Sequence, residues 1–209
     1  MNDIVMQRRA VLRALGLWTA TVIVFAVSDG MRLLPPPGVP VLIFGSTLLM
    51  GRVLWRRGPR ALMDLDLRIP IALHVLRLPV GLWFIALGAE GLLDPRFVTV
   101  AGYGDIVAGA LAALALVAIT TAGANKARAA VLAFNVVGTL DILAVLFTAQ
   151  RIILFDGGLD AMRGMFALPG PMIPAWLVPL VLMTHALVFL RLRKANEAPA
   201  LHRTPEPNL

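Results

Sequence analysis

Six long apolar runs constrain the fold of this chain more than any other feature. A helix needs about 20 predominantly apolar residues to cross a bilayer, and it satisfies its own backbone hydrogen bonds there. The runs lie at about 12–29, 39–55, 69–90, 103–122, 129–149 and 174–191. They predict an all-α fold, a polytopic transmembrane bundle of about six spanning helices that forms a single domain over residues 1–194.

Composition points to the same class of protein. Hydrophobic residues make up 59% of the chain and charged residues 15%, whereas soluble domains carry about a quarter charged residues. The net charge of +7 does not indicate a nucleic-acid partner, because the basic residues cluster at the ends of alternate apolar runs and form no contiguous basic face. The absence of cysteine excludes disulfides, thiolate metal sites and a cysteine nucleophile.

The first run allows a second interpretation. Arg8, Arg9 and Arg13 precede it, and it ends in the small-residue sequence Ala26-Val27-Ser28, as a cleaved secretory signal does. We favour an uncleaved first helix, because a protein with five further spans rarely needs a cleaved signal.

Basic residues also predict an orientation. Fourteen Lys and Arg residues fall on one side of the predicted bundle and four on the other. The positive-inside rule therefore places both termini in the cytoplasm, which an even number of spans allows. The tail at 195–209 is polar and contains proline, and we expect it to be disordered.

Polar residues inside the apolar runs mark the region where function is expected. The third run holds His74 and Arg77, the fifth holds Asn135 and Asp141, and the sixth holds His185. Ionisable groups at such positions are rare, and they usually face one another or a wet cavity. A rise of about 1.5 Å per residue places all five in the cytoplasmic half or the middle of the bilayer. We therefore predict a polar cluster between the third, fifth and sixth spans.

Arg77 needs a partner within that cluster. A guanidinium stays charged and costs roughly 2.5–3.5 kcal/mol at mid-membrane. Asp141 is the only carboxylate expected at sufficient depth, because Asp105 falls near the outer end of the fourth run. Gly138, one turn before Asp141, lets a neighbouring helix or a ligand approach. An Arg77–Asp141 pair either fixes helix packing alone or belongs to a ligand site or pathway. Pro79 is expected to loosen and bend the third span.

The histidines allow several roles. His74 and His185 lie at similar depth on two helices, which suits axial ligation of haem b or two ligands of a metal ion. Alternatively they form a proton relay, or each donates to a backbone carbonyl or to a hydroxyl such as that of Thr184 or Thr139. We expect no cofactor, since a metal site would need a third ligand and Asp141 lies too far from the histidine layer.

The fourth run has small residues at a helical spacing. Ala101, Asp105, Gly109 and Ala113 repeat at four, and such rows let helix backbones approach closely. This run therefore predicts a packing helix, and the row could serve as the surface of a homo-oligomer. Asp105 is included among the candidate site residues, and the helix dipole favours its charge at the N-terminal end.

Several short sequences together resemble one family. They are Arg77-Leu78-Pro79, Gly88-Ala89-Glu90-Gly91, Ala101-Gly102-Tyr103-Gly104-Asp105-Ile106, Asn135-Val136-Val137-Gly138-Thr139-Leu140-Asp141, and Val178-Pro179 with His185. They resemble a group of small uncharacterised bacterial membrane proteins with a GWGDI-like and a WNxxGLxDL-like element. Tyr103 and Phe134 stand where that pattern has tryptophan. The resemblance covers roughly 70–190 and implies a bacterial inner-membrane protein, without implying an activity.

Three functions fit these observations. The first is a small transporter or permease-like protein, in which Arg77 binds an anionic group and Asp141 neutralises Arg77 when the site is empty. The second is a haem-binding redox protein with His74 and His185 as axial ligands. The third is a structural or assembly subunit whose polar groups only fix helix packing. An enzyme is less favoured, because HExxH, GxSxG and phosphate-binding glycine loops are absent. We favour the transporter, whose small-molecule ligand the residues do not identify.

Overall fold

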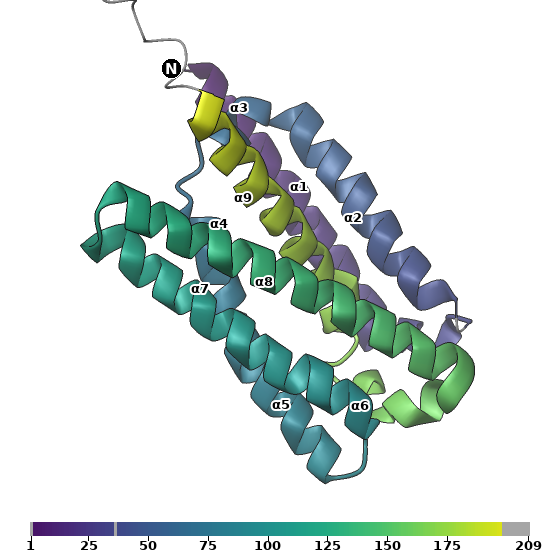
Figure 1. Ribbon diagram of the computed structural model, residues 1–209. Helices are drawn as coiled ribbons and strands as arrows, with labels where there is room; N and C mark the ends of the chain where they lie inside the picture. Colours follow the sequence, from purple (N-terminus) through teal and green to yellow (C-terminus); the bar gives the residue numbers. More distant parts are fainter. Residues whose placement is uncertain (1, 36, 198–209) are drawn as a thin grey trace, which may run out of the picture.

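The chain folds into a bundle of helices (Figure 1). The structure is a computed structural model that describes residues 2–35 and 37–197, and within this part no strand occurs. Six of its helices are long and apolar enough to cross a membrane, which confirms the predicted fold class. The six spans are Asp3–Val27, Gly38–Arg57, Arg68–Ala89, Pro95–Thr121, Ala124–Asp156 and Ile173–Lys194.

The first two spans are regular helices. Helix α1 (Asn2–Val27) starts well before the predicted run, because no proline interrupts its polar first turns. A short turn, η1 (Gly30–Leu33), leads to α2 (Gly38–Arg57), and α3 (Pro59–Met63) follows as a single turn with proline at its start.

The α-helix of the third span is interrupted near Pro79, as the sequence predicts. It consists of α4 (Arg68–Leu73), one 3₁₀ turn η2 (His74–Leu76) and α5 (Arg77–Ala89). Pro79 has no amide hydrogen for the carbonyl of Val75, so the hydrogen-bond ladder is interrupted at this turn. The interruption sets His74 at the start of the turn and Arg77 directly after it.

The helix of the fourth span begins at Pro95, earlier than the start at about residue 103 that hydropathy predicts. It runs through α6 (Pro95–Phe97), the π-helical η3 (Val98–Tyr103) and α7 (Gly104–Thr121). The Asp94 carboxylate accepts a hydrogen bond from the Arg96 amide at 2.8 Å and caps the helix, with proline in the first position. This Asp-Pro start signal is readable in the sequence. Because the span starts at Pro95, Asp105 lies in the middle of the span and not near its outer end.

The last two spans also contain π-helical segments, at the end of the fifth span and at the start of the sixth. Helix α8 (Ala124–Arg151) continues into η4 (Ile152–Asp156), and a 3₁₀ segment, η5 (Gly158–Phe166), follows. The segment η6 (Ile173–Leu177) leads into α9 (Val178–Glu197). Of the tail expected to be disordered at 195–209, residues 195–197 therefore continue α9. Residues 198–209 lie outside the described part of the chain.

The helices form two groups that meet along α9. Helix α7 packs against both α5 and α8, while α9 packs against α8 and α2, and α1 packs against α2 (Figure 1). The start of α1, the end of α9 and the α7–α8 turn lie on one side of the bundle, which we call the basic side because it carries Arg8, Arg60 and Lys126. The segments that follow α1, α5 and α8 lie on the opposite side.

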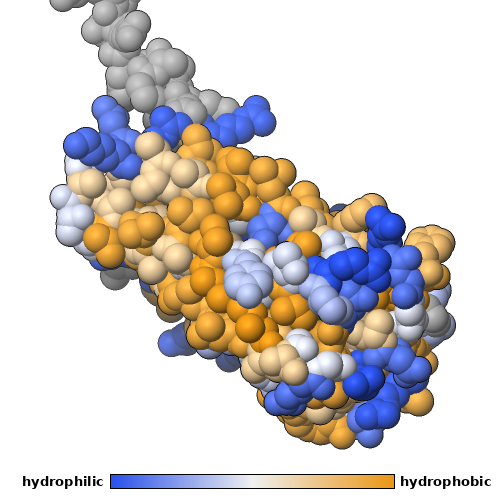
Figure 2. All heavy atoms as spheres, turned by 60° about the horizontal axis from the view of Figure 1, so that its bottom comes forward, coloured by the Kyte–Doolittle hydropathy of each residue, from blue (hydrophilic) through white to orange (hydrophobic). Residues whose placement is uncertain are grey.

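The surface between these two sides is apolar. Figure 2 shows hydrophilic residues gathered toward the ends of the molecule, with a mainly hydrophobic band between them. Large side chains of the spans such as Leu48, Leu82 and Phe147 are exposed, Phe147 to 71%. Contiguous exposure of this kind is unfavourable in water and is expected where helices face lipid.

A polar layer lies between two apolar cores of the interior. One core, toward the opposite side, includes Phe84, Phe97, Ile142, Met165 and Leu177. The other, toward the basic side, includes Ile71, Ala112, Phe134 and Val188. In each of the third to sixth spans the buried polar residues fall between the two cores, so all of them lie near the middle of the bundle.

The small-residue row of the fourth span packs against other helices of the same chain. Ala101, Asp105 and Gly109 of the row are buried and Ala113 is half-buried, and a Cβ added at Gly109 would lie 2.8 Å from Leu78 of α5. The row therefore brings α7 close to its neighbours, as a packing helix should. Three of its four residues are thus covered within the chain, and a homo-oligomer stays a prediction.

Candidate functional site

Arg77 is the centre of the polar layer. Its side chain is 2% exposed, and its Nε donates to Asp105 Oδ1 at 2.6 Å. One Nη donates to Asp141, and the other donates to the carbonyl oxygen of Gly138 at 3.3 Å. The predicted Arg77–Asp141 pair is thus present, and Asp105 adds a second carboxylate that the sequence analysis placed too far outward. We call Arg77, Asp105 and Asp141 the charged triad.

Two glycines make this arrangement possible. The Asp141 carboxylate lies directly against Gly104, where any Cβ would overlap it. A Cβ at Gly138 would lie 2.7 Å from Cε1 and 3.0 Å from Nε2 of His185, and 3.5 Å from Nη1 of Arg77. The approach expected at Gly138 therefore occurs, and it brings the imidazole of α9 next to the guanidinium of α5.

The charged triad carries more negative than positive charge. One guanidinium faces two carboxylates, which leaves one formal negative charge when both are ionised. The side chains of Asp105 and Asp141 are only 9% and 13% exposed. An uncompensated charge at such a position is unfavourable, because desolvation of an ion costs several kcal/mol even after relaxation. The triad is therefore electrically complete only with one further positive charge, supplied by a proton or by a bound cation.

The two buried histidines contact each other beside the charged triad. Their ring centroids are 4.2 Å apart, and Phe134 packs against both rings. Nε2 of His74 lies 2.9 Å from the hydroxyl of Thr184, one of the partners that the sequence suggests. Nδ1 of His185 lies 2.8 Å from Oδ1 of Asn135, which the sequence analysis did not foresee. We call His74 and His185 the histidine pair.

The hydrogen bonds determine where each neutral ring carries its proton. The Thr184 hydroxyl donates to the carbonyl of Leu180 at 2.7 Å, so it accepts from Nε2 of His74. The Asn135 amide nitrogen donates to the backbone carbonyl of His185 at 3.2 Å, so its oxygen accepts from Nδ1 of His185. Nδ1 of His74 and Nε2 of His185 are then bare acceptors, and neither has a hydrogen-bond partner.

The histidine pair does not fit axial ligation of haem. Axial imidazoles stand on opposite faces of the porphyrin, whereas these two rings touch each other and the ring of Phe134. Zinc is usually held by three or four protein ligands, and the described residues contain no group of three His, Asp or Glu side chains placed to hold a metal ion.

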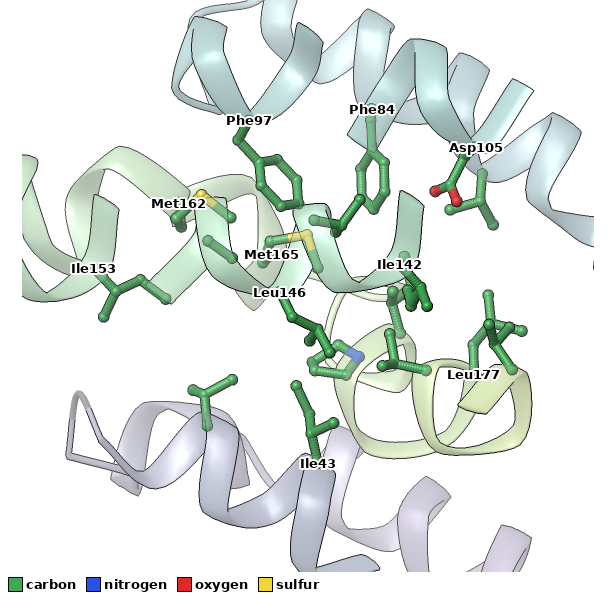
Figure 3. A pocket seen from close by; sticks show the side chains of 18 of the residues that line it. Ile43, Phe84, Phe97, Asp105, Ile142, Leu146, Ile153, Met162, Met165 and Leu177 are labelled. Atoms are coloured by element: carbon green, nitrogen blue, oxygen red, sulfur yellow. The ribbon is translucent and has the colours of Figure 1, made fainter. Parts of the chain in front are cut away.

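An apolar cavity of about 80 Å³ lies between the charged triad and the opposite side. Among the described residues that line it, only Arg77 and Asp105 are charged. Figure 3 shows Asp105 at one edge of this cavity and Met162 and Ile153 toward the other, with side chains from several spans between them. Its shape and lining suit a small, mainly apolar group with its polar end at the triad.

A larger cavity of about 890 Å³ lies on the other side of the polar layer. Residues of α1, α2, α4 and α9 line it, and most of them are apolar. Thr184, the partner of His74, is in its lining, and so are the exposed residues Arg8 and Asp64 of the basic side. The polar layer therefore separates two cavities, with the charged triad at one and the hydroxyl of Thr184 at the other.

The structure brings all six candidate residues into this one layer. Arg77, Asp105 and Asp141 form the triad. Asn135, His74 and His185 form a second polar group beside it. Phe134, which packs on both histidines, was not singled out as a site residue, and an aromatic residue inside an apolar run carries no sequence signal for such a role.

Comparison with known proteins identifies a family. A family model described as a domain of unknown function, DUF8737, matches residues 36–193, and the chain therefore belongs to this family. The match includes every residue of the polar layer and leaves α1 outside. No curated protein and no solved structure matches the chain.

Proposed function

We propose that this protein is a small permease in which a proton and a small organic cation compete for the negative charge of the charged triad. The observation that carries the proposal is one buried guanidinium held between two carboxylates from other spans, at the inner end of an apolar cavity. A proton on one carboxylate, or a cation in the cavity, makes the triad neutral. Binding of either one therefore displaces the other, which is the basis of coupling.

The charge balance selects the class of solute. An anion near Arg77 meets two carboxylates that already occupy the guanidinium, so the anionic ligand first expected for this site is disfavoured. A cation complements the excess negative charge, and an apolar body complements the remainder of the cavity lining. The solute is therefore a small cation with apolar substituents, such as an alkylated ammonium ion.

The orientation follows from the distribution of basic residues. We infer that the basic side faces the cytoplasm of a bacterial cell and that the protein resides in the inner membrane, as the positive-inside rule indicates. In this orientation the small cavity lies in the outer half of the bilayer, and the larger cavity lies in the cytoplasmic half.

Reconstituted vesicles test the proposal. With a pH indicator inside, a gradient of tetramethylammonium is expected to change the internal pH at least tenfold faster with the protein than without it. Asp105→Asn and Asp141→Asn are expected to abolish this change, because either variant removes the excess negative charge. Asp94→Asn is the matched control, since that carboxylate lies at a helix start outside the spans.

A structural or assembly subunit is the competing function. The observation in its favour is that Arg77 joins three spans through its side chain. In that case both aspartate variants would lower stability, and vesicles with the wild-type protein would show no cation-driven pH change. Arg77→Ala does not separate the two functions, because it leaves two carboxylates without a counter-charge and strongly destabilises the protein in either case.

A further inference from the structure

We propose that the larger cavity binds one zwitterionic phospholipid from the membrane leaflet on the basic side, with an acyl chain inside the cavity and the headgroup at Arg8 and Asp64. This site goes beyond the proposed function, because it lies across the polar layer from the smaller cavity. Four features of the larger cavity support the assignment: the chemistry of its lining, its length, its opening to the surface and the charges at its basic end.

The first feature is the lining of the larger cavity, which is apolar except in four places. Among the described residues that line it, the polar ones are Thr184 and, at the basic side, Arg8, Asp64 and Asp66. The hydroxyl of Thr184 is already bonded to a histidine ring and to a backbone carbonyl. A buried water molecule needs about two to four polar partners. The apolar part of this cavity is therefore suited to hydrocarbon and not to water.

The second feature is the length of the cavity. On α9 its lining runs from Leu180 to Leu190, with Trp176 beyond Leu180, and a rise of about 1.5 Å per residue gives about 15 Å for α9. The hydrocarbon core of a bilayer is about 30 Å thick, so one leaflet contributes about 15 Å. The volume of about 890 Å³ falls within the range of about 300–1,000 Å³ that ligand sites have. The cavity therefore matches an acyl chain of one leaflet in length.

The third feature is that the cavity opens to the apolar surface of the bundle. Val11, Leu54 and Ala61 of its lining are buried. Leu12 and Leu190 of the same lining belong to the first and sixth spans and are 67% and 48% exposed. Exposed apolar side chains on spans are expected to face lipid. An acyl chain can therefore enter the cavity from the membrane without crossing water.

The fourth feature is a pair of opposite charges at the basic end. Arg8 and Asp64 are exposed, and neither forms an ion pair within the part of the chain that the structure describes. Asp66, the third charged residue of the lining, is already bonded to Arg68. A guanidinium and a carboxylate together complement a headgroup that carries a phosphate and a primary ammonium group. An anionic headgroup would instead place a second negative charge beside Asp64.

Hydrogen bonds between α1 and α3 bring these two charges to the same end of the cavity. Oε1 of Gln7, the neighbour of Arg8, accepts from the amides of Arg60 and Ala61 at 3.1 and 3.3 Å. One turn further along α3, the amide of Asp64 donates to the carbonyl of Arg60 at 2.8 Å. These bonds hold the start of α1 against α3, so one headgroup can reach both charges.

Fluorescence quenching tests whether an acyl chain enters the cavity. Phosphatidylethanolamine with a brominated acyl chain is added to the protein in detergent. Trp55 and Trp176 both line the cavity, so Trp55 is replaced by Phe throughout to leave one tryptophan there. We expect quenching that saturates at one lipid per protein, because bromine then lies close to Trp176.

Two further variants identify the quenched residue. Trp176→Phe should remove the saturable quenching, whereas Trp83→Phe, which replaces a half-buried tryptophan outside the cavity lining, should retain it. Quenching that never saturates, or that survives in Trp176→Phe, would overturn the site.

Filling the cavity tests the same assignment without removing an aromatic residue. Gly51 of α2 lines the cavity, and a Cβ there would meet Met183 at 3.8 Å, which is an ordinary contact. Gly51→Leu is therefore expected to fold and to lower the affinity for the brominated lipid at least tenfold. Gly45→Leu is the matched control, because Gly45 lies on the same helix and outside the cavity lining. Equal affinity in the two variants would contradict the proposal.

Lipid competition tests the headgroup. In native mass spectrometry with equal amounts of phosphatidylethanolamine and phosphatidylglycerol, the wild-type protein is expected to prefer the former by about threefold, as suits an exposed ion pair. Asp64→Asn should abolish this preference, and Arg8→Gln should weaken the binding of both lipids. Arg9→Gln is the control, since Arg9 is exposed on the same turn and does not line the cavity. A wild-type protein that retains neither lipid, or that prefers phosphatidylglycerol, would overturn the assignment.

Discussion

The molecule contains two arginine–carboxylate groups that differ in their surroundings. Arg77 is held between two carboxylates in the middle of the bundle, and its side chain is 2% exposed. Arg96 is likewise held between two carboxylates, with Nη1 at 2.7 Å from Asp156 and Nη2 at 2.9 Å from Asp94, but its side chain is 52% exposed. We call Arg96, Asp94 and Asp156, with Arg151 bonded to Asp156, the exposed network.

Ion pairing of the same kind has different consequences in the two places. Water screens the exposed network, so a net charge there would change the stability of the protein little. The bonds of this network hold the segments of the opposite side together. The charged triad lies where water cannot screen it, so every unit of charge must be matched by a partner, a proton or a cation. Of the two groups, the proposed function therefore depends on the triad.

The largest expected effect follows removal of the buried guanidinium. Arg77→Met leaves Asp105 and Asp141 without a counter-charge, which is expected to lower the free energy of unfolding by about 3–5 kcal/mol. Thermal unfolding in detergent measures this, with Arg96→Met as the matched control. Equal losses in the two variants would mean that burial does not distinguish the two groups.

The second effect is non-additive. Asp105→Asn and Asp141→Asn each leave one carboxylate on Arg77, so each single variant is expected to stay folded with a small loss of stability. The double variant leaves the guanidinium unpaired, and its loss is expected to exceed the sum of the single losses by about 1–3 kcal/mol. Unfolding of the four proteins in one double-mutant cycle measures the difference, and simple additivity would contradict a shared charge.

A third, smaller effect concerns the space between the triad and the histidine pair. Gly138→Ala places a methyl group 2.7 Å from Cε1 of His185, so we expect a loss of about 1–3 kcal/mol from overpacking. Gly45→Ala is the matched control, because a Cβ there has no neighbour within 4 Å, and it should be neutral or stabilising. If both substitutions were equally harmless, the close approach at Gly138 would be in doubt.

The smallest effect is expected in the exposed network. Arg96→Ala should shift the unfolding temperature by at most a few degrees, and high salt should reduce the shift further. The hydrogen bond from Arg96 lowers the pKa of Asp94 below its ordinary value. The stabilisation from that carboxylate is therefore present above about pH 4 and is lost as the pH falls through the lowered pKa. The unfolding temperature of the wild-type protein should be lower at pH 3 than at pH 7, and this difference should be smaller in Arg96→Ala.

Much of the architecture was readable from the residues alone. The six apolar runs predict six spans, because span length and backbone satisfaction depend only on local composition. The buried positions of Arg77, Asn135 and His185 follow from their places inside those runs, and the interruption of the third span follows from Pro79. The start of the fourth span was also readable, in Asp94 and Pro95, although hydropathy alone places it too late.

Tertiary structure alone decided how these residues meet. The second carboxylate on Arg77, the contact between His74 and His185, and the bond from His185 to Asn135 each join different spans. Depth along a helix follows from a rise of about 1.5 Å per residue, which is a local quantity. The rotation and register of one helix against another depend on the packing of all their side chains, so pairings across spans, and the cavities between them, arise only when the whole bundle assembles.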